Sequence, residues 1–312
     1  MEPINIMFNG IPGNVAATIA AHIAVDPRFN LLPFSMTGPE IDQKQYTIKS
    51  MSKNIGQMGE RVMAIDKSVD ITLVKPDERY NTIIQIIQRF PQIIAVDFTH
   101  PAAVNGNAEF YAKFNIPFVM GTTGGDREAL NKTVLSSSIS AVIAPNMAKQ
   151  IVGFQAMMEY AAETFPDLFK GYTLQIKESH QKGKADTSGT AKAMVKYYNK
   201  LGIPFKEDDI IMDRDPEIQK NRWNIPEQYL SGHAWHTYTL TSDNDSAKFE
   251  FSHNINGRDI YAQGTIDAIL FLHSRIKNRV DGSILLDSSN DNKNMNRGIV
   301  YTMIDVLKGN RI

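Results

Sequence analysis

The stretch that decides the fold lies near the start of the chain and reads Ile4-Asn-Ile-Met-Phe-Asn-Gly-Ile-Pro-Gly-Asn-Val-Ala-Ala-Thr-Ile-Ala-Ala-His-Ile23. It opens as a short apolar strand, turns at Gly10 and Gly13, and continues as an apolar helical run. Two glycines in such a turn allow a phosphate group to approach the N-terminus of the helix closely, and Ala16 lets the helix pack on the strand. An ordinary turn between a strand and a helix can look the same, so the prediction of a dinucleotide site depends on the strands that follow.

Short apolar strands alternate with helical patterns through the first half of the chain. The expected strands cover residues 4–8, 31–34, 71–74, 93–96, 118–120 and 141–144. Strands that are buried on both faces read as continuous apolar runs, and these do. The alternation therefore predicts an α/β fold with a Rossmann-like, doubly wound parallel sheet.

The strands change in character after about Pro145. Residues 236–240, 248–251 and 259–262 alternate apolar and polar side chains, which is typical of an antiparallel sheet with one solvated face. We expect a second, α+β domain with a mostly antiparallel open sheet, followed by a long amphipathic helix over residues 263–277. The predicted domains are a dinucleotide-binding domain, residues 1–146 plus about 262–312, and a substrate-binding and oligomerisation domain, about 147–261.

Composition narrows the class of protein. Of the 312 residues 42% are hydrophobic and 21% charged, and the formal net charge is −1. A mixed, nearly neutral charge pattern lacks the basic surface that nucleic-acid-binding proteins use, and no apolar run reaches the roughly 18 residues of a membrane span. The chain contains no cysteine, which excludes disulfides, thiolate nucleophiles and cysteine-ligated zinc. We expect no nucleic-acid or membrane partner, and a cytoplasmic protein; a plastid protein without its transit peptide would look the same. The polar segment 287–297 is expected to be a surface loop.

A second informative stretch reads Glu178-Ser-His-Gln-Lys-Gly-Lys-Ala-Asp-Thr-Ser-Gly-Thr190. It lies between an alternating strand pattern, residues 172–178, and a helical pattern, residues 191–198, so Ser188 is placed to cap the helix. Free N–H groups at a helix start bind carboxylate or phosphate, and His180 and Lys184 are near enough in sequence to supply protons and positive charge. The loop predicts a site for an acidic small molecule.

Several of these residues also have possible roles that are structural rather than catalytic. A single loop histidine or lysine is usually solvated, and only the joint pattern favours a site. Lys182 is expected to face solvent, Glu178 to orient the loop and Asp186 to anchor it. His233 and His236 resemble a metal pair, but a spacing of three residues on a strand points them to opposite faces, so we expect no metal site. Ser188 lacks the strand-to-helix elbow of serine hydrolases.

The stretch from Glu178 to Thr190 resembles the substrate signature of dihydrodipicolinate reductases, most closely that of their plant-type branch. Five further segments resemble the family in order and spacing: Val96–Pro101, Pro117–Gly125, Ala144–Met147, Ser231–His233 and Asn256–Arg258. The resemblance covers nearly the whole chain. It implies an NAD(P)H-dependent reductase of lysine and diaminopimelate biosynthesis that forms a homodimer or homotetramer.

The resemblance also implies roles at the substrate end. A reduced nicotinamide gives hydride to a cyclic imine with two carboxylates, and a proton must reach the adjacent ring carbon. The implied catalytic residues are His180 and Lys184, and the implied substrate-binding residues are Gln181, Ser188, Gly189, Thr190 and Arg258. Gln181 occupies the place of a second histidine in many members outside the plant-type branch, so His180 is expected to act without a titrating neighbour. For Arg258, a structural salt bridge stays open as an alternative.

At the cofactor end, the end of the second strand reads Phe34-Ser-Met-Thr-Gly38 and has no acid to bind the ribose hydroxyls of NADH. The hydroxyls of Ser35 and Thr37 favour NADPH, whereas Asn14 stands where related reductases carry a cation for its 2′-phosphate, so NADH stays open. The expected cofactor-binding residues are Gly10, Ile11, Pro12, Gly13, Asn14, Val15, Ser35, Thr37, Phe98, Thr99, Gly121, Thr122, Thr123, Pro145, Asn146 and Met147.

Two other functions remain in view. A different NAD(P)-dependent reductase of a small dicarboxylate would keep the glycines at 10 and 13 without needing residues 180–190. A non-catalytic metabolite sensor would keep both pockets, and Asn14 and Gln181 are the departures that favour it.

Overall fold

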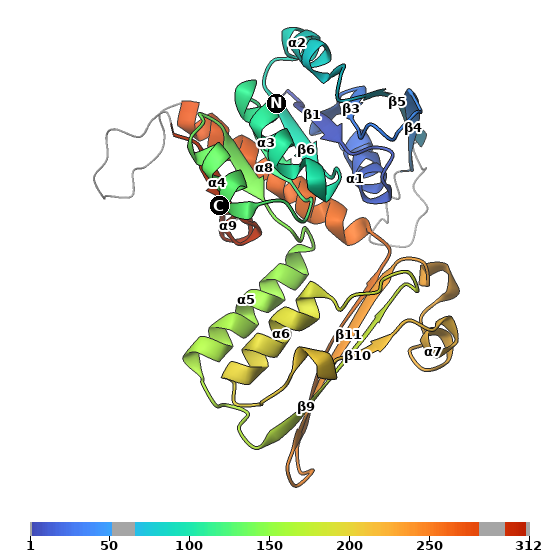
Figure 1. The fold of residues 1–312 in the computed structure, drawn as a ribbon, viewed down its shortest axis with the longest axis vertical. Helices are drawn as coiled ribbons and strands as arrows, with labels where there is room; N and C mark the ends of the chain where they lie inside the picture. The colour runs from blue at the N-terminus through green and yellow to red at the C-terminus, as the bar shows by residue number, and fades with distance from the viewer. Residues whose placement is uncertain (1, 52–65, 281–296, 310–312) are drawn as a thin grey trace, which may run out of the picture. The chain divides into compact units, whose positions relative to one another are not determined.

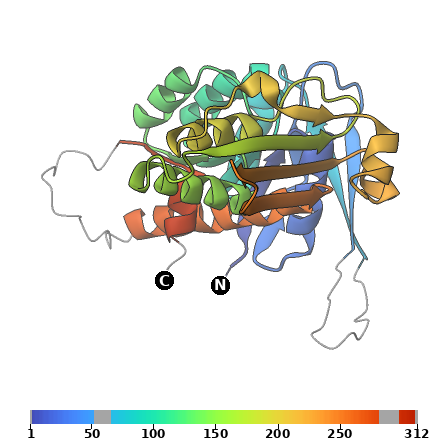
Figure 2. The ribbon, with the colours of Figure 1, turned by 90° about the horizontal axis from the view of Figure 1, so that it is seen from below.

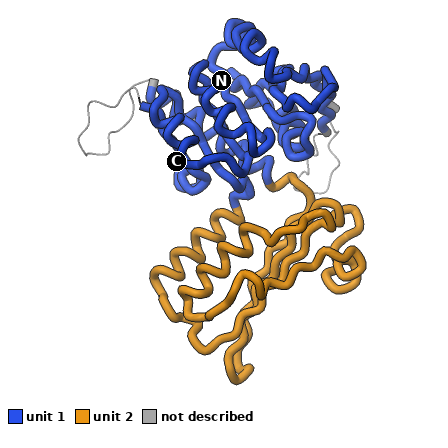
Figure 3. Tube along the Cα trace, viewed as in Figure 1, with its two compact units in different colours: residues 1–149, 261–312 blue, residues 150–260 orange. Residues whose placement is uncertain are grey.

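The structure is a computed structural model that describes residues 2–51, 66–280 and 297–309. The chain forms two compact units, residues 1–149 with 261–312, and residues 150–260 (Figure 3). Both limits fall close to the expected domain boundaries. Among the described residues, no helix combines the length and the apolar character that a membrane crossing requires.

Unit 1 contains a parallel sheet in the order β13-β8-β7-β6-β1-β2, and Figure 1 labels its strands β1 and β6. All of its pairings are parallel, which confirms the predicted doubly wound sheet. Its strands are β1 (Ile4–Asn9), β2 (Phe29–Leu31), β6 (Ile93–Asp97), β7 (Phe118–Met120), β8 (Ser140–Ile143) and β13 (Ile299–Tyr301).

Helices cover both faces of this sheet. Alternate strand residues such as Met7, Ala95 and Phe118 share one buried cluster with side chains of three helices, α2 (Arg79–Arg89), α3 (Val104–Lys113) and α4 (Arg127–Leu135). The intervening residues Ile6 and Val96 are buried as well. Helices α1 (Asn14–Val25) and α8 (Asp259–Val280) lie on the side opposite to α3 and α4 (Figure 2), and α9 (Met303–Gly309) closes the unit.

The expected strand 31–34 is two strands. Pro33 has no N–H to donate to the ladder, and β2 ends before it. The chain continues as β3 (Phe34–Met36), which pairs with β5 (Asp66–Val74) and, through it, with β4 (Gln45–Met51) in a separate three-stranded sheet. The predicted strand 71–74 therefore exists, but it belongs to this smaller sheet.

Unit 2 is a four-stranded sheet in the order β10-β9-β11-β12. Strands β9 (Tyr172–His180), β11 (His233–Ser242) and β12 (Lys248–Asn256) are antiparallel, and β10 (Ile211–Asp213) is parallel to β9. Helices α5 (Lys149–Thr164) and α6 (Gly189–Lys200) pack on one face of the sheet through a shared apolar cluster (Figure 1). A short helix, α7 (Pro216–Asn221), follows β10.

The expected strand over residues 259–262 is wrong, because these residues are the first turn of α8. The alternation of Asp259-Ile-Tyr-Ala262 also fits a helix whose buried side chains, Ala262, Ile266 and Ile269, recur every three to four residues. Arg258 therefore precedes a helix. Of the predicted loop 287–297, all residues but Arg297 lie outside the described part of the chain.

Candidate active site

The loop of residues 181–188 connects β9 to α6, as predicted. Strand β9 ends at His180, and the hydroxyl of Ser188 caps α6 by accepting a hydrogen bond of 3.2 Å from the N–H of Thr190. The cap satisfies one of the N–H groups that a helix start leaves without a partner. The chain therefore turns sharply from the strand that carries His180 into the helix that begins at Gly189.

Glu178 holds this loop in place. Its side chain is fully buried, and its carboxylate accepts hydrogen bonds from the N–H of Ser188 at 3.1 Å and from Nη2 of Arg214 at 2.5 Å. The Nε of Arg214 also donates to the carbonyl of Lys184 at 2.8 Å. A buried carboxylate needs such partners, because burial removes its hydration. Glu178 thus has the orienting position that was expected, with Arg214 as its partner.

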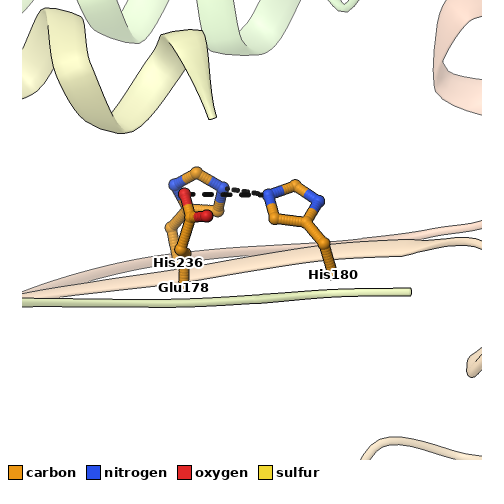
Figure 4. Close-up of side chains that lie close together, drawn as sticks. All are labelled: Glu178, His180 and His236. Carbon is orange, nitrogen blue, oxygen red and sulfur yellow. Dashed lines mark hydrogen bonds and ion pairs between the residues drawn. The ribbon is translucent and has the colours of Figure 1, made fainter. Parts of the chain in front are cut away.

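His180 has an ionisable neighbour. Its Nε2 lies 3.1 Å from Nε2 of His236 and 3.9 Å from a carboxylate oxygen of Glu178 (Figure 4). Glu178 pairs directly with His236 across the β9–β11 ladder, so His180, two residues further along β9, is the diagonal neighbour of His236. The expectation that His180 acts without a titrating neighbour is wrong, because the strand register supplies one.

The same face of the sheet carries two more groups. His236 pairs with His253 on β12, and their rings stack with centroids 4.5 Å apart. The hydroxyl of Tyr238 lies 3.1 Å from Nδ1 of His236 and 3.4 Å from Nε2 of His253. We call His180, His236, Tyr238 and His253 the histidine row; it lies on the side of the sheet that α5 and α6 cover.

The histidine row is neutral at pH 7 without a ligand. Burial lowers the pKa of His180 to about 3, and the positive charges of Arg214 and Lys184 act in the same direction. Burial also lowers the pKa of His253 to about 4, and burial together with His253 and His180 lowers the pKa of His236 well below its ordinary value. A bound anion raises the pKa of a nearby histidine, so a dicarboxylate is the kind of ligand that makes His180 an acid.

A carboxylate oxygen of Glu178 and one ring nitrogen each of His180 and His236 lie within 4.8 Å of one another, close enough to surround a metal ion. The carboxylate of Glu178 is already paired with Arg214 and Ser188, and both Arg214 and Lys184 add positive charge beside the histidines. A cation would have to displace these partners. We therefore interpret the cluster as an acid–base group.

The remaining loop residues are more exposed. Nζ of Lys184 forms an ion pair of 2.9 Å with Asp186, and this hydrogen bond lowers the pKa of Asp186. Lys182 faces solvent, as expected, and Gln181 is half-buried. Gly189 is exposed, and a β-carbon there would meet nothing within 4 Å.

Arg258 and Gly232 lie side by side at the end of the sheet. A β-carbon at Gly232 would stand 3.3 Å from Nη1 of Arg258. The N–H of Gly232 donates to the carbonyl of Tyr229 at 2.9 Å, and the carbonyl of Gly232 accepts a hydrogen bond of 2.7 Å from the N–H of Gly257. This bond joins the turn before β11 to the turn after β12, so the position of Arg258 follows from the ladder.

In unit 1, the turn between β1 and α1 is built as the sequence predicts. Gly10 has a φ of +101°, and a β-carbon there would overlap the carbonyl of Phe98. Gly13 is the N-cap residue of α1 and supplies no side-chain hydrogen bond to the helix. The first N–H groups of α1 are therefore open to an anion, and the turn fits the pyrophosphate of a dinucleotide. We call residues 9–14 the glycine turn.

The residues after β3 border the glycine turn. The N–H of Gly10 donates to the carbonyl of Met36 at 2.9 Å, which places Thr37 next to the turn. Ser35 is fully buried, and its hydroxyl accepts from the N–H of Ile11 at 3.2 Å. Both hydroxyls were expected to face a phosphate. The Ser35 hydroxyl instead stabilises the turn, and Thr37 is the more exposed of the two residues.

The carboxyl ends of β6 and β7 form the rest of this edge. The Phe98 ring lies where a side chain at Gly121 would stand, so only glycine fits there. Thr99 and Thr122 both donate to the buried carboxylate of Asp97, at 2.8 and 3.1 Å. The other expected cofactor residues here follow the ends of strands β7 and β8: Thr123 and Pro145 are exposed, Met147 is buried, and Asn146 accepts a hydrogen bond from the N–H of Ala148.

Sequence reasoning missed several residues that the structure brings to these sites. Asp97 accepts hydrogen bonds from Tyr111 at 2.7 Å and Asn107 at 2.9 Å, and it organises the edge of the sheet. Arg214 follows β10 in a stretch without a motif. His236 and Tyr238 share one face of their strand by alternation, but only the pairing of β11 with β9 and β12 shows what they meet.

Family models match nearly the whole chain. The model described as dihydrodipicolinate reductase, N-terminus, matches residues 4–147, and the model described as dihydrodipicolinate reductase, C-terminus, matches residues 151–307. The boundary between the two matched regions coincides with the first boundary between the structural units, and the second model also matches residues 261–307, which belong to unit 1.

Relatives cover most of the chain. It is 41% identical over 305 residues to 4-hydroxy-tetrahydrodipicolinate reductase 1, chloroplastic, of Arabidopsis thaliana, covering 98% of the chain and 78% of that protein. It is 46% identical over 239 residues to probable 4-hydroxy-tetrahydrodipicolinate reductase 2, chloroplastic, of Oryza sativa subsp. japonica, covering 77% of the chain and 69% of that protein.

A solved structure shares the fold. Dipicolinate-bound dihydrodipicolinate reductase from Paenisporosarcina sp. TG-14 superposes with a TM-score of 0.56 at 18% identity, over 87% of this chain and 95% of that chain.

Proposed function

The chain belongs to the dihydrodipicolinate reductase family, and from this premise we propose that it reduces 4-hydroxy-tetrahydrodipicolinate to tetrahydrodipicolinate with a reduced nicotinamide cofactor. The reaction is a step of lysine and diaminopimelate biosynthesis. The glycine turn at the edge of a parallel sheet supports the cofactor site, and the loop between β9 and α6 supports a dicarboxylate site.

The observation that best supports this function is the loop between β9 and α6 of unit 2, which Glu178 holds in place. Glu178, buried and paired with Arg214, fixes the end of β9 and the start of α6 against each other. His180 at the end of β9, Lys184 in the loop and the exposed backbone of Gly189 at the start of α6 lie around this anchor. These are the groups that two carboxylates and one proton transfer require.

The residues divide the chemistry as follows. When bound, a reduced nicotinamide supplies the hydride. We assign Lys184, Arg258 and the N–H groups at the start of α6 to the substrate carboxylates, with Gln181 and Thr190 as further hydrogen-bond donors. His180 supplies the proton, because the negative charge of the substrate raises its pKa from the low value that burial imposes. Lys184 also stabilises negative charge that develops as the ring is reduced.

For the cofactor, we propose NADPH as the preferred form, with NADH accepted. Thr37, directly after β3, is not an acid that would repel a 2′-phosphate, and it lies next to the glycine turn; the first acid after β3 is Glu40, whose carboxylate lies beside Gly38. Ser35 no longer counts toward this preference, because its hydroxyl accepts from the chain itself. Asn14 offers a hydrogen bond but no charge, so we expect a moderate preference.

We also propose a homodimer or homotetramer that forms through unit 2, as in the family. Strand β12 is an edge of its sheet, and Phe249 on it is 43% exposed. A plastid location accords with the relatives from Arabidopsis and Oryza, whose names place them in the chloroplast.

One experiment tests the function. The purified chain is supplied with substrate made in place by a dihydrodipicolinate synthase, and oxidation of NADPH and of NADH is followed separately by absorbance. Pyridine-2,6-dicarboxylate, a planar dicarboxylate analogue, should inhibit. Oxidation that this analogue blocks, and that is about 100-fold slower in Lys184→Ala, supports the proposal, whereas cofactor binding without turnover would favour the sensor.

A further inference from the structure

His180 lies at one end of the histidine row. The proposed reaction gives no role to the other three members of this row. Its Nε2 faces Nε2 of His236 at 3.1 Å, Nδ1 of His236 faces the hydroxyl of Tyr238 at 3.1 Å, and that hydroxyl faces Nε2 of His253 at 3.4 Å. His180 and His236 are 7% and 1% exposed, so neither ring can exchange its partner for water freely.

Two neutral imidazoles that share one contact must differ in tautomer. One Nε2 has to carry the hydrogen and the other has to accept it, and the choice at one nitrogen sets the role of the other nitrogen in the same ring. If Nε2–H of His180 donates to His236, then Nδ1–H of His236 donates to Tyr238, and the hydroxyl of Tyr238 donates to His253. All three contacts are then satisfied in a single direction.

The acid form of His180 allows only this direction. A protonated imidazole carries hydrogen on both nitrogens, so Nε2 of His236 must be the acceptor. In Figure 4, Nδ1 of His180 points away from His236 and Glu178, and its hydrogen is the one that can leave without disturbing the row.

We propose that His236 is a positioning residue that holds His180 in the Nε2–H tautomer, with Tyr238 and His253 fixing the tautomer of His236 in turn, so that the transferable proton is carried on Nδ1 of His180. This proposal rests on the proposed function. It gives His236 the part that the aspartate has in a Ser-His-Asp triad, where the third group orients the imidazole and stabilises its charged form.

The proton step balances on this arrangement. The N–H bond at Nδ1 of His180 breaks, and a C–H bond forms at the ring carbon next to the one that receives hydride from the reduced nicotinamide. The imidazolium becomes neutral imidazole while Nε2–H stays bonded to His236. Solvent returns a proton to Nδ1 when the next dicarboxylate binds, because the neutral row takes up this proton only beside a bound anion.

The charged and titratable groups around the row favour a neutral acceptor at position 236. Glu178 from β9 is already paired with Arg214, which approaches from the segment after β10, and Lys184 approaches from the loop. Burial and the positive charges of Arg214 and Lys184 lower the pKa of His236, as they lower the pKa of His180. Tyr198 of α6 also faces the row, and His233 of β11 acts on His180 from the other face of the sheet, where it contacts Ser179.

Two variants separate positioning from packing. His236→Phe keeps a ring but removes both nitrogens, and Tyr238→Phe removes a single oxygen from the same row. His273→Gln, at a half-buried histidine of α8 in unit 1, is the control for loss of a histidine elsewhere.

For His236→Phe we expect kcat to fall about 100-fold and KM for the substrate to change less than about threefold, because the loss falls on proton transfer rather than binding. The alkaline limb of the pH profile of kcat should move to lower pH, since the acid form of His180 loses its charge-assisted acceptor. Tyr238→Phe should give a smaller fall, about threefold to tenfold, with the same direction of shift. His273→Gln should keep the wild-type profile.

A measurement without turnover completes the test. Nitrogen-15 NMR of the imidazoles, with His180 assigned from the spectrum of His180→Gln, should show His180 as the Nε2–H tautomer in the wild type and as a mixture in both row variants. A wild-type Nδ1–H tautomer, or an unmoved pH profile in Tyr238→Phe, would overturn the proposal. If the wild type oxidises neither cofactor, the proposed function fails, while the tautomer still decides the order of the row. If His236→Phe does not fold, Tyr238→Phe decides alone.

Discussion

The glycine turn of unit 1 and the histidine row of unit 2 are built in opposite ways. The glycine turn consists of residues 9–14, and its shape follows from backbone conformation at Gly10 and from the absence of a side chain at Gly13. The histidine row is assembled by side chains from three strands, and its closest contact joins positions 56 residues apart. A site made of backbone can be recognised from a short stretch of sequence, whereas a site made of paired strands depends on their register.

The largest effect is expected where unit 2 depends on a distant partner. Glu178→Gln should destabilise the protein by about 3–5 kcal/mol, because Arg214 is left without its buried carboxylate partner. Thermal and urea unfolding would measure the loss. Asp186→Asn, at an exposed carboxylate of the same loop, is the matched control and should unfold like the wild type. Equal stability of both variants would mean that the loop does not depend on Glu178.

Next in size is the loss of the loop cation. Lys184→Ala should lower kcat about 100-fold, while the Kd for NADPH stays within about twofold, because Lys184 belongs to the substrate loop and not to the glycine turn. Steady-state kinetics and fluorescence titration with NADPH give the two numbers. Lys182→Ala, two residues earlier and exposed, controls for loss of charge in the same loop. A near-normal kcat for Lys184→Ala would remove Lys184 from the chemistry.

The corresponding change in the glycine turn acts through the backbone. Gly10→Ala should destabilise by about 2 kcal/mol and weaken NADPH binding, because φ at this position is +101° and the added carbon overlaps the Phe98 carbonyl. Unfolding and cofactor titration measure both effects. Gly106→Ala is a suitable control, since a β-carbon there meets nothing within 4 Å. If Gly10→Ala bound NADPH normally, the turn would not be the pyrophosphate site.

A smaller effect is expected at the edge of that turn. Thr37→Asp should lower kcat/KM for NADPH about tenfold and change the value for NADH much less, because an acid there repels a 2′-phosphate and can bind ribose hydroxyls. Thr37→Asn, which has the same shape without the charge, is the control. An equal fall with both cofactors would show that Thr37 does not face the ribose.

The smallest predicted effect is the pH dependence of folding stability that the histidine row causes. The pKa of His253 is about 4 in the folded protein and about 6.5 in the unfolded chain, so only the unfolded chain takes up this proton as pH falls from 6.5 to 4. Stability that is complete above pH 6.5 should therefore decline on acidification, by about 1 kcal/mol per pH unit for this group. Urea unfolding at pH 7, 6 and 5 should show a shallower decline for His253→Phe than for the wild type. If stability declined equally with pH in both proteins, His253 would not be held neutral in the folded protein.

Much of the fold was predictable because its signals are local. The apolar runs at residues 93–96 and 118–120 identify buried parallel strands, and the two glycines of the turn identify the first connection. The errors also have local causes. Pro33 separates two strands that one apolar run had joined, and residues 259–262 fit a helix as well as a strand because four residues do not distinguish the two periods.

The candidate site was predictable in part for the same reason. The Ser188 cap and the placement of His180 at the end of a strand follow from one continuous stretch. His236 was considered only with His233, as a metal pair, and their placement on opposite faces was foreseen from strand alternation. Nothing in the sequence near His236 shows that β9 lies beside it, so its contact with His180 could not be anticipated.

By itself, then, the sequence determined the parallel sheet with its glycine turn and the capped loop that carries His180 and Lys184, because φ preferences, alternation and helix caps act over a few residues. Only the tertiary structure decided what those groups face. The pairing of Glu178 with Arg214 and of His180 with His236 spans 36 and 56 residues, and it depends on which strands are neighbours and in what register. Burial by α5 and α6 then sets the charge of the row, since the free energy of an ionised group depends on the surroundings that the whole fold creates.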